Sequence, residues 1–249
     1  MSEVMEEKRV KKYPIAEIFT SPQGEGLYSG TLMTFVRIAG CSVGKPMTGD
    51  ERTHFSNLEQ KDLALYREKC TLYDGRTFAC DTNFQTSEAI TAAEIMSRIP
   101  DGVEHMCITG GEPLNHDITD LMEAAYDKVV DVHIETSGTV SLKRSWKEFK
   151  ARHLIGDSVS GWVWITVSPK KGCLDMMIGL ASELKLLVDE DFDISKVPSD
   201  WLNKSLVYIQ AVNGEHTINR ENVNRCLQLQ RQYPHLKISN QNHKNWGVR

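Results

Sequence analysis

The stretch His105-Met106-Cys107-Ile108-Thr109-Gly110-Gly111-Glu112-Pro113 predicts how this chain folds. Its first four residues read as a strand, and a glycine-rich polar loop follows directly. Glycines at that place let the backbone approach the polar end of a ligand, and Glu112 can accept hydrogen bonds from an amine. In parallel α/β folds, ligands bind where the strands end. The stretch therefore indicates a parallel sheet with a binding site at its carboxyl edge.

The same strand–loop pattern recurs along the chain. Short apolar runs predict further strands at Ile15–Phe19, Leu32–Ile38, Val129–Ile134, Trp162–Val167, Leu184–Val188, Leu206–Ile209 and Leu236–Ser239. Between them, a capping box of Thr91 and Glu94 starts a helix that Pro100 ends, an apolar stripe from Ile118 to Ala125 predicts a second helix, and Thr217–Tyr233 a third. About six or seven such units fall short of a full eight-fold barrel. The pattern predicts an α/β fold with parallel strands and outer helices.

Composition indicates one globular domain over residues 1–249. Of its residues 40% are hydrophobic and 25% charged, which is ordinary for such a domain. The net charge of −5 gives no electrostatic reason to expect nucleic acid binding. No apolar run is long enough to span a membrane, and the charged segment 1–12 lacks a signal core and reads as a flexible arm. We expect a cytoplasmic protein with reduced thiols.

Three of the six cysteines, Cys41, Cys70 and Cys80, fall within forty residues, separated by a charged insert over 42–69. Three thiolates can hold an iron–sulfur cluster and leave one iron open to a small molecule. The spacing alone leaves two other readings open, buried structural thiols and a zinc site. The remaining cysteines are scattered singly and are expected to be structural: Cys107, Cys173 and Cys226.

Polar residues near the start of the chain suggest a second part of the site. The segment Thr20–Gly26 is predicted to be a loop, in which Gln23 and Glu25 could hold a polar heterocycle through hydrogen bonds. A plain surface turn is the alternative. Arg37 stands near the end of an apolar strand, where a buried charge needs a partner, so an anionic ligand is plausible.

The ordered set of short motifs resembles a known family. The chain is similar to radical S-adenosylmethionine (SAM) enzymes, and within them to the 7-carboxy-7-deazaguanine synthases. The matching pieces are Glu17-Ile18-Phe19, Gln23-Gly24-Glu25-Gly26, Phe35-Val36-Arg37, Gly40-Cys41, Cys80-Asp81-Thr82, Thr109–Leu114, Glu135-Thr136-Ser137-Gly138, Ser168-Pro169-Lys170 and Gln241–Gly247. The cluster loop departs from the family, because Thr77 stands where a cysteine is expected and Cys70 is the only other candidate within the loop.

The resemblance implies a fold and a reaction. The fold is a partial (β/α)6 barrel of the radical SAM type, in a homodimer. A 4Fe-4S cluster reduces SAM, and the resulting radical starts the conversion of 6-carboxy-5,6,7,8-tetrahydropterin to 7-carboxy-7-deazaguanine with loss of ammonia, a lyase reaction of queuosine-type 7-deazapurine biosynthesis. Mg²⁺ assists, and an electron-donor protein such as flavodoxin supplies the electron.

The resemblance also implies the site residues. The cluster ligands would be Cys41, Cys70 and Cys80, and the magnesium ligand Thr82. Substrate contacts would be Pro22, Gln23, Gly24, Glu25, Arg37, Thr109 and the C-terminal Arg249. SAM contacts would be Gly111, Glu112, Ser168, Pro169, Lys170, Gln210, Ala211, Val212 and Asn213.

Two other functions stay open at the level of sequence. One is a radical SAM activase that makes a glycyl radical on a partner protein, which has no need of the Gln23–Gly26 loop. The other is a non-enzymatic scaffold that binds a metal through three structural thiols.

Overall fold

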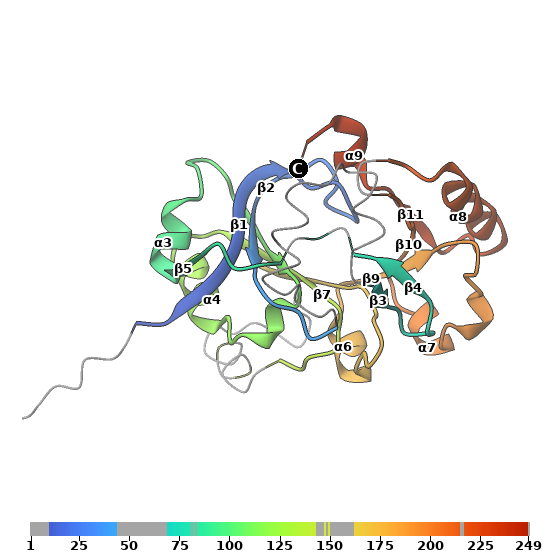
Figure 1. The fold of residues 1–249 in the computed structure, drawn as a ribbon, viewed down its shortest axis with the longest axis horizontal. Helices are drawn as coiled ribbons and strands as arrows, with labels where there is room; N and C mark the ends of the chain where they lie inside the picture. The colour runs from blue at the N-terminus through green and yellow to red at the C-terminus, as the bar shows by residue number, and fades with distance from the viewer. Residues whose placement is uncertain are drawn as a thin grey trace, which may run out of the picture.

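A nine-stranded sheet forms the centre of the protein, with the strand order β11-β10-β9-β8-β7-β6-β2-β1-β5 (Figure 1). The computed structural model describes residues 10–43, 69–80, 82, 84–142, 147, 149, 162–214 and 217–248. The arm 1–12 lies outside these residues except for its last three positions. Arg249 and the greater part of the 42–69 insert also lie outside them.

Seven neighbouring strands of this sheet run parallel: β2 (Leu32–Ile38), β6 (His105–Gly110), β7 (Asp131–Thr136), β8 (Val163–Val167), β9 (Glu183–Val188), β10 (Val207–Ala211) and β11 (Lys237–Ser239). The predicted parallel arrangement is confirmed for this part. It is wrong for β1 (Lys12–Pro22), which pairs antiparallel with β2 and with β5 (Glu88–Thr91), a strand that was not predicted. A short loop joins β1 to β2, and only an antiparallel partner can be reached by so short a connection.

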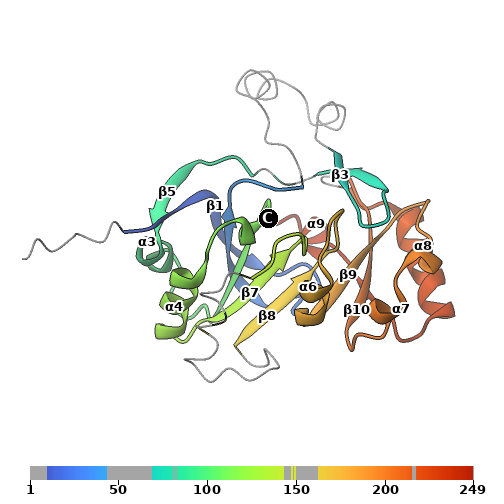
Figure 2. The same cartoon turned by 90° about the horizontal axis from the view of Figure 1, so that it is seen from below.

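Helices pack against the outer side of the sheet (Figures 1 and 2). In chain order they are α3 (Ala92–Ser97), α4 (Thr119–Asp127), α6 (Asp175–Leu180), α7 (Ser199–Leu202) and α8 (Arg220–Gln232), with short 3-10 turns at Pro113–Asn115 and Ile194–Lys196. The C-terminal helix α9 (Asn242–Trp246) lies apart from them, beside the loop between β1 and β2. Helix α4 contacts β7, α6 contacts β8, and α8 contacts β9 and β10. Among the described residues, no helix has the length and hydropathy that crossing a membrane requires.

The core lies between the sheet and these helices. Strand residues such as Val132, Ile134, Ile165 and Leu184 are fully buried there. The near-continuous apolar runs of these strands are typical of parallel strands that are covered on both faces. Burial of this apolar surface is the main term that stabilises the fold.

The predicted capping box is present at the start of α3. The Thr91 hydroxyl accepts a hydrogen bond from Glu94 N at 3.2 Å, and the Glu94 carboxylate accepts one from Thr91 N at 2.7 Å. The helix has ended by Arg98, shortly before Pro100, as predicted. This local signal needs no tertiary contact, so the sequence could reveal it.

Several element boundaries differ from the expectation, and two of the differences have a clear structural basis. Strand β1 continues through Thr20, Ser21 and Pro22, which pair with β2, so the expected loop begins only at Gln23. Strand β7 begins at Asp131 rather than Val129, because Val129 has a left-handed backbone (φ 57°) that a strand cannot contain.

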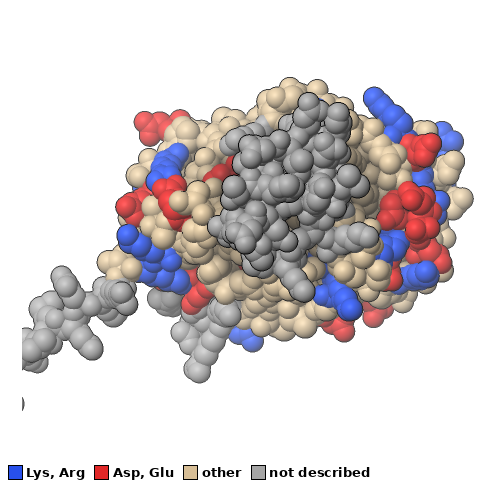
Figure 3. All heavy atoms as spheres, in the orientation of Figure 1, with Lys and Arg blue, Asp and Glu red and all other residues tan. Residues whose placement is uncertain are grey.

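A separate hairpin consists of β3 (Lys69–Thr71) and β4 (Thr77–Ala79) and was not predicted. It lies beside the carboxyl ends of the main strands (Figure 2). On the face shown in Figure 3, acidic and basic side chains alternate around the rim, and neither sign gathers into one patch.

Candidate active site

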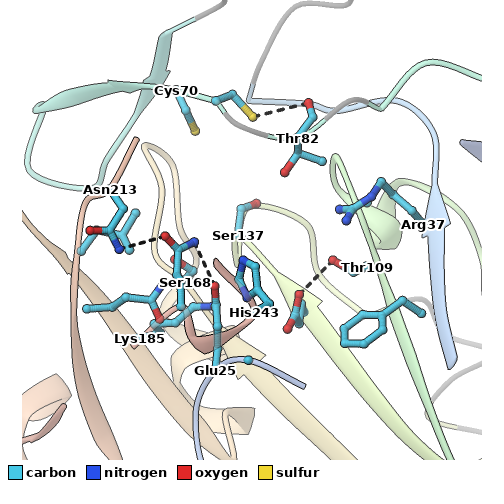
Figure 4. A pocket seen from close by; sticks show the side chains of 18 of the residues that line it. Glu25, Arg37, Cys70, Thr82, Thr109, Ser137, Ser168, Lys185, Asn213 and His243 are labelled. Atoms are coloured by element: carbon cyan, nitrogen blue, oxygen red, sulfur yellow. Dashed lines mark hydrogen bonds and ion pairs between the residues drawn. The ribbon is translucent and has the colours of Figure 1, made fainter. Parts of the chain in front are cut away.

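A pocket of about 710 Å³ opens at the carboxyl ends of the parallel strands, where the sequence placed the site. The hairpin β3–β4 borders it on one side and helix α9 on another (Figure 4). Most of the residues that the sequence nominated line it: Pro22, Gln23, Gly24, Glu25, Arg37, Cys41, Cys70, Cys80, Thr82, Thr109, Gly111, Ser168, Lys170, Gln210, Ala211, Val212 and Asn213. Segments from most of the chain therefore meet in one cavity. Among the nominated residues that the structure describes, Glu112 and Pro169 do not line it.

Glu112 is fully buried beneath the pocket rather than exposed to it. Its carboxylate accepts hydrogen bonds from Leu114 N at 3.1 Å, from Thr136 Oγ1 at 2.8 Å and from Ser137 N at 2.8 Å. The Ser137 hydroxyl donates to it as well. The carboxylate thus joins the loop after β7 to the loop after β6 through hydrogen bonds. This placement does not support the expected contact of Glu112 with SAM.

Arg37 extends from β2 into the pocket (Figure 4). Its Nε atom donates to Glu17 Oε1 at 2.7 Å, and its guanidinium carbon lies 6.0 Å from the centroid of the Phe19 ring. Phe19 in turn stacks on Phe35, with 5.0 Å between ring centroids. The hydrogen bond to Glu17 uses the Nε atom, and a guanidinium can bind an anion through two parallel hydrogen bonds from its Nη groups.

A buried ion pair forms part of the pocket wall and was missed by sequence reasoning. Lys185 of β9 donates to Glu25, and their side chains are only 10% and 14% exposed. Burial alone would raise the pKa of Glu25, but the Lys185 ammonium outweighs it and lowers that pKa to about 2. Burial works against the charge of Lys185 too, yet the carboxylates around it, first Glu25 and then Glu135, raise its pKa. The sequence does contain an indication of this ion pair: Lys185 is a single lysine inside the apolar run Leu184–Val188, and a buried lysine needs a partner.

Glu135, at the end of β7, is a second missed member of the site. It accepts hydrogen bonds from Thr109 Oγ1 at 3.0 Å and from Gln23 Nε2 at 3.2 Å. Gln23 also accepts a hydrogen bond from Glu25 N at 3.1 Å. Polar residues of three chain segments are therefore joined in one network before any ligand binds.

The C-terminal segment completes the pocket. Gln241 donates to Glu25 Oε1 at 3.0 Å, and Asn242 N donates to Gly24 O at 3.0 Å. A Cβ atom on Gly24 would lie only 2.8 Å from the backbone nitrogen of His243. Gly24 thus lets the chain's own C-terminal segment approach closely.

Three thiols line the opposite part of the pocket. Cys41 follows β2, Cys70 lies in β3, and Cys80 follows β4, where its Sγ lies 3.9 Å from Thr82 O. Gly111 permits the close passage of the Cys41 segment, because a Cβ atom there would lie 2.7 Å from the Cys41 Cβ. Across the described residues, no three His, Cys, Asp or Glu side chains are grouped tightly enough to hold a single metal ion. Three soft sulfur donors facing one cavity nevertheless fit an iron–sulfur cluster, which spreads its ligands over several irons.

The other cysteines lie outside the pocket. Cys107 and Cys226 are fully buried, and burial raises the pKa of Cys226 to about 12. Cys107 packs with Met33 and Phe35, so its predicted place in the core is confirmed. Cys173 is partly buried, and burial followed by the charge of Asp175 raises its pKa to about 11. A raised pKa keeps a thiol protonated and a poor ligand.

Comparison with known proteins relates the chain to one kind of enzyme. No family model matches the chain. It is 28% identical to the 7-carboxy-7-deazaguanine synthase of Synechocystis sp. over 242 residues, which cover 95% of this chain and 94% of that protein. It is 29% identical to the enzyme of the same name from Buchnera aphidicola, over 86% of this chain and 90% of that protein. Among solved structures, QueE from Escherichia coli superposes with a TM-score of 0.60 at 22% identity and covers 92% of this chain.

The mostly parallel sheet, with a polar pocket at its carboxyl edge, defines an α/β enzyme. The near-complete sequence matches identify the kind of enzyme. The chain is similar along nearly its whole length to 7-carboxy-7-deazaguanine synthases, which are radical SAM enzymes that use a 4Fe-4S cluster and SAM.

Proposed function

We propose that this protein converts 6-carboxy-5,6,7,8-tetrahydropterin to 7-carboxy-7-deazaguanine with loss of ammonia. One observation carries the proposal. A single pocket has three thiols in one part and, in the other, Arg37 and the hydrogen-bonded pair Gln23 and Glu25, in a chain that matches such synthases over nearly its whole length.

The thiol side would hold the cofactors. Cys41, Cys70 and Cys80 would bind a 4Fe-4S cluster, with Cys70 in place of the cysteine missing at Thr77. When bound, the cluster and SAM supply the one-electron chemistry that starts the reaction. The carboxyl ends of β6, β8 and β10 and the loops after them would bind SAM, since Gly111, Ser168, Lys170 and Gln210–Asn213 all line the pocket.

The network side would hold the substrate. Arg37 can pair with the substrate carboxylate through its two Nη groups. Glu25 is kept ionised by Lys185, so it can accept hydrogen bonds from ring N–H groups of a pterin. Thr109 and Gln23, both already bonded to Glu135, would fix the ring edge. Prior organisation of these groups lowers the entropic cost of orienting the substrate.

Thr82 is the proposed magnesium ligand. It lines the pocket next to Cys80, between the thiols and Arg37 (Figure 4). A hard cation such as Mg²⁺ prefers oxygen ligands and keeps several waters. A single hydroxyl, completed by oxygens of the substrate and by water, is therefore a sufficient site.

The family resemblance supports further proposals. The continuous sheet supports one radical SAM domain with 42–69 as an insert, and its seven parallel strands with outer helices support a partial (β/α)6 barrel. An electron-donor protein such as flavodoxin and a second copy of the chain are the proposed partners, and the cytoplasm is the proposed location. Native mass spectrometry of the cluster-loaded protein tests for the dimer.

The reaction is tested by mass spectrometry of product formation. Anaerobically reconstituted protein receives SAM, a strong reductant, Mg²⁺ and 6-carboxytetrahydropterin as the only substrate. We expect 7-carboxy-7-deazaguanine at a rate that Cys41→Ala abolishes and Cys226→Ala leaves unchanged. A brown protein that cleaves SAM without forming this product would refute the proposal, and a glycyl radical on a partner would favour an activase. A colourless protein without iron would favour the scaffold.

A further inference from the structure

The hairpin β3–β4 explains how two cysteines ten positions apart in sequence become neighbours. Cys70 pairs with Phe78 across the hairpin, and Cys80 follows two residues after Phe78. Side chains alternate between the two faces of a strand, and cross-strand partners share a face. Cys70, Phe78 and Cys80 therefore lie on one face, and all three line the pocket. Thr77 falls on the other face, where it is exposed.

A hairpin of this size needs support from the rest of the protein. An isolated two-stranded hairpin is marginally stable in water at best. β3 and β4 have three residues each and belong to no larger sheet. Their position must therefore be fixed by contacts with other elements.

Arg76, just before β4, makes the strongest of these contacts. Its Nε donates to Asp74 at 2.7 Å within the turn, its Nη1 donates to Asp189 at 2.6 Å, and its Nη2 donates to Leu187 O at 3.0 Å. The guanidinium carbon also lies 5.0 Å from the centroid of the Phe192 ring. The Arg76 side chain is only 11% exposed, so these charged hydrogen bonds are shielded from water. They join the hairpin turn to the end of β9.

A second set of contacts joins the hairpin to the loop after β8. Leu72 forms a β-bridge with Lys170, and Lys171 N donates to Thr71 O at 2.9 Å. The Lys170 ammonium lies 5.2 Å from the centroid of the Phe78 ring, on the face that carries both cysteines. This set is mostly backbone, so side-chain substitution leaves it in place. Arg76 is the part of the anchor that mutation can remove.

We propose that Arg76 is a positioning residue for the cluster, because it fixes the hairpin that carries Cys70 and Cys80 against the end of β9. The inference rests on the proposed function for the cluster itself. Arg76 does not line the pocket and touches neither cofactor nor substrate directly. Its loss would let the hairpin move and separate the two thiols from Cys41, which is attached to the main sheet. Asp189 is the partner through which it acts.

The test compares Arg76→Gln, Arg76→Lys and Asp189→Asn with a matched control, Arg98→Gln. Arg98 forms an ion pair with Glu88 at 2.8 Å, but that pair is exposed and remote from the pocket. Each protein is reconstituted anaerobically. Iron and sulfide per folded chain, the spectrum of the reduced cluster, and the rate of iron loss to a chelator are measured. The melting temperature of the cluster-free protein is recorded in parallel.

We expect Arg76→Gln to lose iron roughly tenfold or more faster than wild type, since it removes hydrogen bonds to charged groups that are shielded from water. Asp189→Asn should show a smaller effect in the same direction, and Arg76→Lys should restore part of the retention through its charge. Arg98→Gln should match wild type. A merely structural role would lower the melting temperature of cluster-free Arg76→Gln and leave iron retention per folded chain unchanged.

Iron content and chelator half-life equal to wild type in folded Arg76→Gln would overturn the inference. If that variant does not fold, wild-type retention in Asp189→Asn would overturn it instead. The proposed function fails separately, when wild-type protein with a full cluster makes no 7-carboxy-7-deazaguanine.

Discussion

Replacing Lys185 with methionine removes the buried ion pair in the pocket wall and so measures its contribution to stability. Lys185 and Glu25 are almost fully covered, and Glu25 is also held by Gln241 at 3.0 Å. Methionine keeps the length and apolar stem of the side chain but removes the charge. Glu25 would then be a buried carboxylate without its cation.

The expected loss of stability is large. Removal of one partner from a buried ion pair costs about 3–5 kcal/mol, because the remaining charge is uncompensated. The pKa of Glu25 is lowered by Lys185 despite burial, which agrees in direction with a favourable interaction between the two charges. For a chain of this length, a loss of 3–5 kcal/mol lowers the melting temperature by roughly 6–20 °C.

The loss should depend on pH in a defined direction. The lowered pKa of Glu25 means that its contribution in wild type is present above about pH 4.5 and is lost as the pH falls towards 2. The raised pKa of Lys185 means that its contribution is present below about pH 10.5 and is lost above. In Lys185→Met, burial raises the pKa of Glu25. Acidification to pH 5 should then protonate Glu25 and recover part of the lost stability.

The assay is thermal unfolding of the cluster-free protein by circular dichroism at pH 7.5 and pH 5. The double variant Glu25→Gln/Lys185→Met serves as the matched control. It should regain most of the loss at pH 7.5, since a neutral buried pair carries no unpaired charge. An equal loss at both pH values, together with no recovery in the double variant, would refute the reasoning.

Three further outcomes are expected. Arg37→Lys should bind 6-carboxytetrahydropterin roughly tenfold to a hundredfold more weakly while still cleaving SAM, because lysine cannot form the two-pronged bond; equal substrate affinity by calorimetry would contradict this. Thr82→Ala should keep a full iron content but lose most of the response of turnover to added Mg²⁺, and an unchanged Mg²⁺ titration would remove the assignment. Glu112→Gln should lower the melting temperature at neutral pH, since the fully buried carboxylate accepts hydrogen bonds from Leu114 N and Ser137 N that a neutral amide replaces less well; an unchanged melting temperature would show that this brace contributes nothing.

Much of the fold was predictable because its signals are local. Leu32–Ile38 is a strand with the predicted boundaries, and Thr91 caps its helix as the sequence indicates. The antiparallel pairing of β5 with β1 was not predictable, because nothing in Glu88–Thr91 itself reveals its partner.

The same distinction applies to the site. Loops at the ends of parallel strands must meet at one edge, so residues such as Thr109 and Ser168 could be nominated from their place in the sequence. The pairing of Lys185 with Glu25 depends on where the loop between β1 and β2 lies relative to β9, and no local sequence pattern encodes that position. Glu112 was predicted to contact SAM because of its motif. In the structure its carboxylate instead accepts hydrogen bonds from Leu114 N and Ser137 N.

The contacts of Glu25 and Gly26 also bear on how the protein folds. Glu25 bonds to Gln241, 216 positions away, and Gly26 N bonds to Ser239, 213 positions away. Closing such long loops costs chain entropy before the contacts can compensate for it, which slows folding. The sheet can assemble strand by strand from nearer neighbours, but this wall of the pocket requires β11 and the segment after it. Affinity for substrate during refolding would therefore appear last, after the helical signal is complete.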